Sequence, residues 1–149
     1  MKIRSAILRS SGVTKPYAES KPIHIEEIEL DAPQEGEVLI QIKAASLCHS
    51  DLSVINGSRP RPLPMALGHE AAGIVKEVGP GVMNFKQGYK VICVFVPSCG
   101  HCVPCAEGRP ALCEPGAKAN GDGTLIGGGV RLHAGTEKIG HHVGVSAFS

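Results

Sequence analysis

Four cysteines stand close together in the chain with the spacing of a metal site. They read C-x2-C-x2-C-x7-C within a stretch rich in glycine and proline, as Cys99, Cys102, Cys105 and Cys113. Short loops between ligands let each sulfur turn toward one centre, and Zn²⁺ favours four thiolates in a tetrahedron. A closed set of ligands leaves no position for a substrate. The cluster therefore predicts a structural zinc site, and reactive groups must be sought elsewhere.

A second group of residues capable of chemistry lies upstream. The motif C-H-S-D spans residues 48–51, and the motif G-H-E spans residues 68–70. The thiolate of Cys48 and the imidazole of His69 could share one metal ion, but a catalytic zinc site usually has three protein ligands. A buried cysteine is more often a small apolar residue. Spacing alone therefore leaves both interpretations of Cys48 and His69 open.

The segments around these residues have the pattern of β-strands. Apolar and polar residues alternate, or apolar residues dominate, over 23–30, 37–45, 71–78 and 89–96. Turn residues separate the segments at intervals typical of an antiparallel barrel or sandwich. Short helices are expected only after Cys48 and around residues 106–107. The glycine-rich residues 116–129 predict a mobile loop.

The composition excludes several classes of partner. With 42% hydrophobic and 19% charged residues and a formal net charge of +1, the chain has no basic stripe for nucleic acid. No apolar run approaches the roughly 20 residues of a membrane span, and no signal peptide is recognisable. We therefore expect a cytoplasmic protein that does not bind membranes. In that compartment, clustered cysteines bind metal more often than they form disulfides.

The order of the motifs resembles that of zinc-dependent medium-chain alcohol dehydrogenases. Besides the motif at 48–51 and the four cysteines, the chain has G-H-E-A-A-G-I-V at 68–75, V-G-P-G-V at 78–82 and G-Y-K-V at 88–91. The match covers nearly the whole chain. It implies a mainly β fold, a GroES-like antiparallel barrel with few short helices and a zinc-binding lobe over residues 97–115.

The resemblance also implies how a reactive zinc would be held. Cys48 and His69 match catalytic zinc ligands, while Glu70 matches a carboxylate that can approach the metal. Asp51 matches the partner that fixes the tautomer of the zinc-bound imidazole, which such ligands generally need. The family's third catalytic ligand is a cysteine beyond residue 149. The resemblance therefore implies a GroES-like catalytic domain over residues 1–149 that is incomplete at its C-terminal end.

Further positions match residues that handle the proton, the cofactor and the substrate. Ser50 matches the hydroxyl that passes the substrate proton toward solvent, although Ser53 replaces the histidine that ends this relay in some family members. His49 matches a contact to the pyrophosphate of the cofactor. Phe95 and Phe148 match positions that line the substrate pocket, and a plain role in the core is the alternative for both.

The resemblance implies a parent enzyme that oxidises an alcohol to an aldehyde or ketone by hydride transfer to NAD or NADP. Such enzymes are commonly homo-oligomers. No nucleotide-binding Rossmann unit is recognisable in this chain, so we expect this segment alone to be inactive. A non-enzymatic zinc-binding GroES-like module is a second interpretation. An iron–sulfur site is a third, but its cysteines would continue as x3-C-P, whereas seven residues precede Cys113 here.

Overall fold

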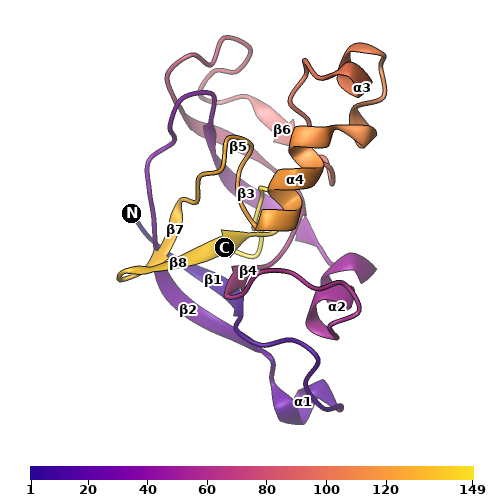
Figure 1. Ribbon diagram of the computed structural model, residues 1–149. Helices are drawn as coiled ribbons and strands as arrows, with labels where there is room; N and C mark the ends of the chain where they lie inside the picture. The colour runs from indigo at the N-terminus through magenta and orange to yellow at the C-terminus, as the bar shows by residue number, and fades with distance from the viewer.

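The computed structural model describes all residues, 1–149, and is built mainly from two sheets (Figure 1). Five strands close a barrel in the order β1-β2-β7-β8-β4. Their bounds are Lys2–Leu8 for β1, Ile23–Leu30 for β2, Met65–Ala66 for β4, Leu132–Ala134 for β7 and Glu137–His141 for β8. All neighbours pair antiparallel except β4 and β8, which run parallel. The predicted antiparallel barrel is confirmed.

The second sheet positions part of the predicted site: Glu70 begins one of its strands, His69 immediately precedes it, and Cys48 follows two residues after another strand. It has the order β3-β5-β6, with β3 at Val38–Ser46, β5 at Glu70–Val78 and β6 at Lys90–Ile92. A bidentate ion pair fastens the first sheet to the second, because Arg131, just before β7, donates to both carboxylate oxygens of Glu37 at 2.9 and 2.8 Å. Both side chains are mostly buried, which places this contact inside the fold.

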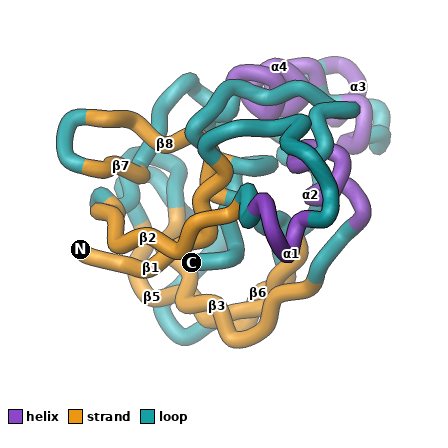
Figure 2. Tube along the Cα trace, turned by 90° about the horizontal axis from the view of Figure 1, so that it is seen from below, coloured by secondary structure: helices purple, strands orange, loops and turns teal.

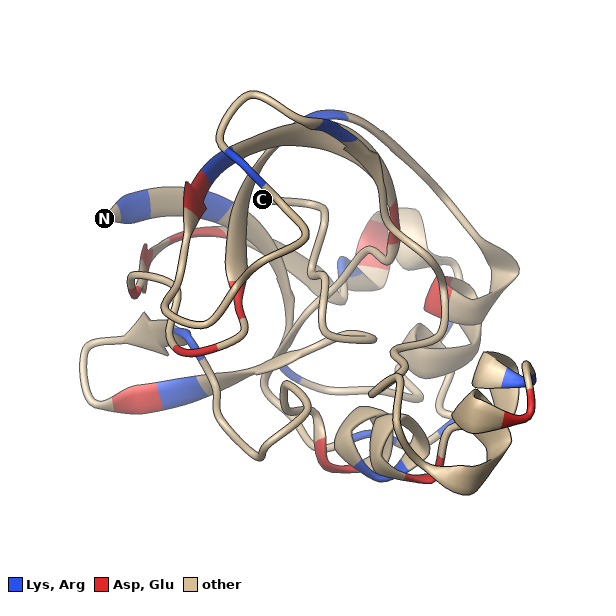
Figure 3. Cartoon of the chain, turned by 90° about the horizontal axis from the view of Figure 1, so that it is seen from above, with Lys and Arg blue, Asp and Glu red and all other residues tan.

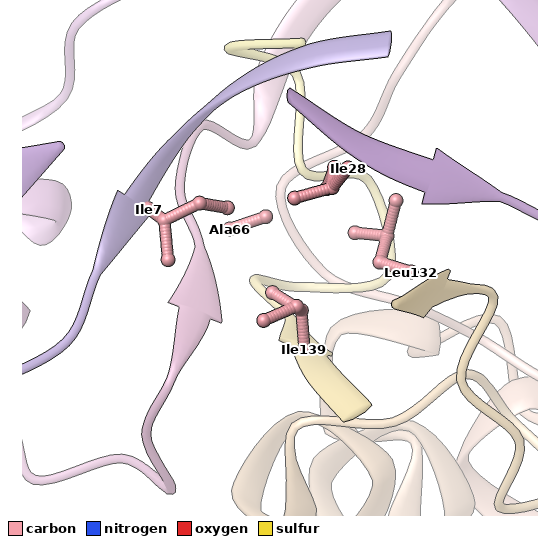
Figure 4. Close-up of a cluster of buried hydrophobic side chains, with 5 residues drawn as sticks. All are labelled: Ile7, Ile28, Ala66, Leu132 and Ile139. Atoms are coloured by element: carbon pink, nitrogen blue, oxygen red, sulfur yellow. The ribbon is translucent and has the colours of Figure 1, made fainter. Parts of the chain in front are cut away.

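The barrel core takes one apolar side chain from each of its five strands (Figure 4). These side chains are no more than 2% exposed and belong to Ile7, Ile28, Ala66, Leu132 and Ile139. Their placement follows from the period of two along a strand, which sends alternate side chains to the same face. Burial of a large aliphatic side chain contributes about 1.5–3 kcal/mol. This cluster therefore stabilises the barrel that supports the site.

The helices are short and lie outside the sheets (Figure 2). They are α1 (Tyr17–Ser20), α2 (His49–Ile55), α3 (Val103–Ala106) and α4 (Glu114–Asp122), with a 3₁₀ turn at Pro110–Leu112. Helices α3 and α4 lie together at one end of the molecule. None of the helices has both the length and the apolar character needed to cross a membrane.

Charged residues of both signs are interspersed over the chain (Figure 3). On the barrel surface, Arg9 donates to Glu26 at 2.8 and 2.7 Å and to Glu137 at 3.0 Å. These exposed pairs join β2 and the β7–β8 hairpin to the end of β1. Because they face water, each contributes little to stability, on the order of 0–1 kcal/mol.

Three of the four predicted strands are confirmed within one residue, and the fourth is shorter than predicted. The pattern at 89–96 predicted a strand through Val96, but β6 ends at Ile92. The last backbone contact to the neighbouring strand is the amide of Cys93, which donates to the carbonyl of Ala71 at 2.8 Å. Strand β5 begins at Glu70, so the following residues have no strand left to pair with.

The predicted loop at 116–129 is wrong for its first part, which lies in α4. Three features compensate for its glycines. Pro115 stands in the first turn, where its missing N–H costs no hydrogen bond. Cys113 caps the helix by accepting from the amide of Gly116 at 3.3 Å, and Gly123 ends it with a left-handed φ of 69°. A Cβ at Gly116 would lie 1.9 Å from the carbonyl oxygen of Pro97. That glycine is therefore required by close packing, not by flexibility.

Candidate functional site

The pairing of β3 with β5 brings the two upstream motifs together. Ser46, the last residue of β3, pairs with Glu70, the first residue of β5. Cys48 follows two residues after Ser46, and His69 immediately precedes Glu70. As a result, ligand atoms of Cys48, His69 and Glu70 all lie within 4.8 Å of one another. We call these three residues the Cys48–His69 site.

Asp51 fastens both halves of this site from the first turn of α2. Its Oδ2 accepts from the amide of Cys48 at 3.2 Å, and its Oδ1 accepts from the amide of Gly68 at 3.3 Å. The same Oδ1 lies 3.2 Å from Nδ1 of His69. Both side chains are 3% exposed. Asp51 is thus a bridge between the residue at the start of α2 and the residue at the start of β5.

The ionisation of Asp51 decides which nitrogen of His69 is free. Burial disfavours the charged carboxylate, but contacts with His142, the amide of Cys48 and His69 together hold the pKa of Asp51 below its ordinary value. An ionised carboxylate can only accept hydrogen bonds, so Nδ1 of His69 carries the proton. Nε2 then keeps its lone pair and is available to a metal ion.

The remaining residues near the Cys48–His69 site are hydroxyls and exposed groups. The hydroxyl of Ser50 lies 3.3 Å from the sulfur of Cys48. The carboxylate of Glu70 accepts from the hydroxyl of Ser46 at 2.5 Å. His49 is the exposed first residue of α2. Ser53 donates to the backbone carbonyl of His49 at 3.1 Å, which engages its hydroxyl within the helix.

The two predicted pocket phenylalanines lie in different surroundings. Phe148 is half-buried and packs against the apolar cluster that contains Leu8, Val54 and Leu67. Its ring also covers Gly68, where an added Cβ would lie 2.7 Å from Phe148. Phe95 is 63% exposed. The structure gives Phe148 a packing role, and a contact of either ring with substrate stays a prediction.

The four-cysteine cluster lies in the lobe at 97–115, away from the barrel core. Its sulfurs lie within 4.8 Å of one another. Backbone amides donate to them: Cys99 to the sulfur of Cys113 at 3.2 Å, and Cys102 to the sulfur of Cys99 at 3.3 Å. Hydrogen bonds from the backbone amide of His101 and, to a lesser degree, from that of Cys102 lower the pKa of Cys99 to about 6. Cys99 is thereby held toward the thiolate, the form that binds metal, whereas burial raises the pKa of Cys105 to about 11. The convergence of four sulfurs is what fits Zn²⁺.

No disulfide links these residues, because all six cysteines of the chain are free. The disulfide interpretation is therefore excluded for this structure. Cys93 belongs to neither group of ligands. It is half-buried, and burial raises the pKa of its thiol. This agrees with an inert role in packing.

A large cavity lies apart from the residues of the Cys48–His69 site. It has a volume of about 460 Å³ and is lined mostly by apolar side chains, among them Val38, Ile40, Leu125 and Val143. None of the predicted site residues lines it.

Sequence reasoning missed His142, which lies next to Asp51 and His69. Its Nδ1 is 3.0 Å from Oδ1 of Asp51, and its ring meets that of His69 edge to face with centroids 4.8 Å apart. His142 stands more than 70 residues from His69 in the sequence, and no spacing rule connects them. The only visible signal is the pair His141-His142 directly after β8.

Comparison with known proteins agrees with this architecture. The family model of the alcohol dehydrogenase GroES-like domain matches residues 34–144. An NDMA-dependent alcohol dehydrogenase from Amycolatopsis methanolica is 45% identical over 149 residues, which is all of this chain and 38% of that protein. The crystal structure of an alcohol dehydrogenase zinc-binding domain protein from Burkholderia ambifaria superposes with a TM-score of 0.86 and 34% identity, over 99% of this chain and 38% of that one.

A benzyl alcohol dehydrogenase from Acinetobacter calcoaceticus also shares the fold, with a TM-score of 0.82 and 29% identity. The alignment covers 99% of this chain and 37% of that structure. The chain thus spans less than two fifths of the length of the relatives that it matches. The matched residues include the C-H-S-D and G-H-E motifs and the four-cysteine cluster. By sequence and by structure, this chain belongs to the alcohol dehydrogenase GroES-like domain family.

Proposed function

We propose that this chain is the zinc-binding part of an enzyme that interconverts an alcohol with an aldehyde or ketone, using NAD or NADP as the hydride carrier. The observation that carries the proposal is the open Cys48–His69 site. A thiol and an imidazole with a defined tautomer converge there at strand ends, while a separate set of four sulfurs forms a closed cluster. An open set and a closed set in one chain are typical of catalytic and structural zinc, respectively.

The donor atoms at each position fit Zn²⁺. Cys48 and His69 would hold the catalytic ion, with Glu70 beside them, and a third ligand would come from residues outside this chain. Cys99, Cys102, Cys105 and Cys113 would hold the structural ion. When bound at the Cys48–His69 site, zinc supplies Lewis-acid chemistry that makes an alcohol hydroxyl more acidic.

The chain's own residues would place and move the proton. Ser50 lies beside the sulfur of Cys48, half-buried, where its hydroxyl can accept a proton from substrate and donate one outward. Asp51 keeps Nδ1 of His69 protonated, so that Nε2 is always presented as a lone pair. Ser53 is engaged by the carbonyl of His49, so the outer end of the relay would be solvent, not Ser53.

Cofactor and substrate would meet this site from outside the chain. His49 is exposed at the start of α2 and is free to contact the pyrophosphate of a nicotinamide cofactor. Phe95, exposed beyond β6, and Phe148, which covers Gly68, would border the substrate. The substrate class is a small-molecule alcohol or the corresponding aldehyde. The NDMA-dependent relative supports the alcohol, and does not by itself choose between NAD and NADP.

The remaining features fit an enzyme part within a larger assembly. We propose that the parent protein is cytoplasmic, because six free thiols suit a reducing compartment. We also propose that it is a homo-oligomer, as the family resemblance implies. The domain would be completed by residues after position 149, since the Cys48–His69 site holds too few ligands for a tight metal site. The isolated chain is therefore expected to be inactive.

The test has two parts that separate this proposal from a non-enzymatic zinc module. First, the chain purified without chelators should contain close to one zinc per molecule, and Cys113→Ser should remove it. Second, a protein that continues beyond residue 149 should reduce NAD or NADP when given a panel of primary, secondary and aromatic alcohols. Cys48→Ser should abolish that activity, whereas Cys93→Ser, the matched control, should leave it intact. Absence of turnover with every alcohol and both cofactors would favour the non-enzymatic module.

A further inference from the structure

His142 is a buried polar side chain aimed at the Cys48–His69 site. The residue is 1% exposed. Its Nδ1 lies 3.0 Å from Oδ1 of Asp51, yet the approach falls short of hydrogen-bond geometry, and Nδ1 has no other partner. Leaving a buried polar atom without a partner costs about 1–3 kcal/mol. An apolar ring of the same shape would avoid this cost, so packing alone does not explain a histidine at this position.

The charge on Asp51 selects the tautomer of His142. If Nδ1 of His142 carried a lone pair, that lone pair would face an ionised carboxylate oxygen at 3.0 Å, and the contact would be repulsive. With the proton on Nδ1, the same contact is attractive, and the 3.0 Å separation is within hydrogen-bond distance. Oδ1 of Asp51 then faces the Nδ1 protons of both His69 and His142.

The backbone around His142 ties this ring to the strand that leads to His69. The amide of His142 donates to the carbonyl of Ala66 at 3.3 Å and to the hydroxyl of Ser146 at 3.2 Å. Farther along, the amide of Ala147 donates to the carbonyl of Gly68 at 2.8 Å. The segment after β8 thus binds the residues immediately before His69. A side chain on this segment is well placed to orient the site.

We propose that His142 is a positioning residue: its Nδ1–H holds the carboxylate of Asp51 against Nδ1 of His69, so that His69 presents Nε2 to the metal. The role rests on the proposed function, because it concerns a ligand of the catalytic ion. It acts through Asp51 and does not require His142 to touch metal, substrate or cofactor. The segment that follows β8 therefore supports the site together with the sheet of β3 and β5.

The test reads ring protonation in the metal-free chain by long-range ¹H–¹⁵N NMR, with the full 149-residue chain. In the wild type, the protons of His69 and His142 should both be on Nδ1. His142→Phe keeps an aromatic ring and removes the donor, and should shift the tautomer ratio of His69 toward Nε2–H by about 10- to 100-fold, the effect of losing one hydrogen bond to a charged acceptor. His142→Asn places an N–H near the position of Nδ1 and should restore most of the wild-type ratio.

His142→Gln is the matched control, because its amide reaches toward the position of Nε2 and should not restore the ratio. Methyl signals of Ile7 and Ile139 report whether each variant is folded. A wild-type His142 protonated on Nε2 would overturn the proposal, as would a His69 tautomer that is the same in all three variants. If His142→Phe does not fold, the contrast between the Asn and Gln variants and the wild-type tautomer still decide.

A second measurement separates this proposal from the proposed function. In a protein that continues beyond residue 149, Co²⁺ added after the four-cysteine cluster is filled should give a thiolate band that Cys48→Ser weakens, and His142→Phe should reduce the affinity of that site by about 10–100-fold. A wild type without the band would contradict the proposed function and leave the tautomer result standing. A band of equal strength in wild type and His142→Phe would contradict only the role of His142.

Discussion

The two candidate metal positions of this molecule are built in opposite ways. The four-cysteine cluster takes all its ligands from 15 consecutive positions, 99–113, in a lobe at one end of the molecule. The Cys48–His69 site joins the end of one strand to the start of another, and its supporting residues Asp51 and His142 come from a helix and from the last segment of the chain. The first depends on local loops, and the second depends on the closed barrel.

This difference has an energetic consequence. A local loop loses little conformational entropy when its ligands converge, whereas a long-range site relies on every contact that fixes the register of the strands. Damage to the barrel should therefore release the Cys48–His69 site first. The following predictions test that order, starting from the largest effect.

Removing a barrel core side chain should give the largest difference between the two sites, because it destabilises the barrel and leaves metal binding by the four-cysteine cluster unchanged. Ile139→Ala deletes a fully buried side chain that packs with Ile7 and Leu132, and should lower the free energy of unfolding by about 2–5 kcal/mol. The four-cysteine cluster should still bind Co²⁺ with wild-type stoichiometry. Urea unfolding and cobalt titration measure the two effects. Ile92→Ala, at an 82% exposed strand position, is the control and should change stability little.

Acidification should loosen the segment that carries His142. Burial, aided by the charge of Arg131, lowers the pKa of the neighbouring His141 to about 4. Below its ordinary value of 6.5 the unfolded chain therefore binds a proton that the folded chain does not, so stability falls as pH drops from about 6.5 to about 4. The loss should reach about 3 kcal/mol at pH 4.

Urea unfolding at several pH values measures this slope. His141→Asn should flatten it, at the cost of lower stability near pH 7, while His24→Asn on the exposed face of β2 should leave it unchanged. An unaltered slope in His141→Asn would mean that other groups bind the proton. The four-cysteine cluster should be monitored separately, because its thiolates also take up protons in acid.

A substitution next to His69 should disturb one site and spare the other. Gly68 has a φ of +91°, and an added Cβ would overlap Phe148, so Gly68→Ala should cost about 2–4 kcal/mol. Gly88→Ala is a matched control, with a φ of +90° and open space around it, and should cost about 1 kcal/mol. NMR signals of His69 should move in the first variant only. Equal costs in the two variants would show that packing against Phe148 is unimportant.

Breaking the local site should have the smallest effect on the rest of the molecule. Cys113→Ser should abolish tight zinc binding, since one of four sulfurs is lost. The barrel should lose less than about 1 kcal/mol, because α3 makes its main contacts with the 3₁₀ turn. Methyl NMR of Ile7 and Ile28 measures this. Spectral changes throughout the barrel would contradict the independence of the two regions.

Much of the architecture can be predicted from the sequence wherever it depends on local patterns of apolar residues and turn residues. Apolar patterning located β2, β3 and β5, and turn residues indicated an antiparallel barrel or sandwich. The short β7 and β8 and the opening β1 were not predicted, because strands of three to seven residues carry few repeats of a period-two pattern. The glycines of α4 predict a loop because glycine has a low helix propensity, whereas a cap at Cys113 and packing against Pro97 stabilise the helix.

The family, the four-cysteine cluster and the pairing of Cys48 with His69 as candidate metal ligands can all be read from the amino-acid sequence. These depend on motifs whose spacing is short or whose order is distinctive. Three contacts become visible only in the folded chain: Asp51 bridges Cys48 and His69, Phe148 packs on Gly68, and His142 reaches Asp51. The physical reason is that contacts between distant segments are set by strand register and barrel closure, which no local spacing encodes.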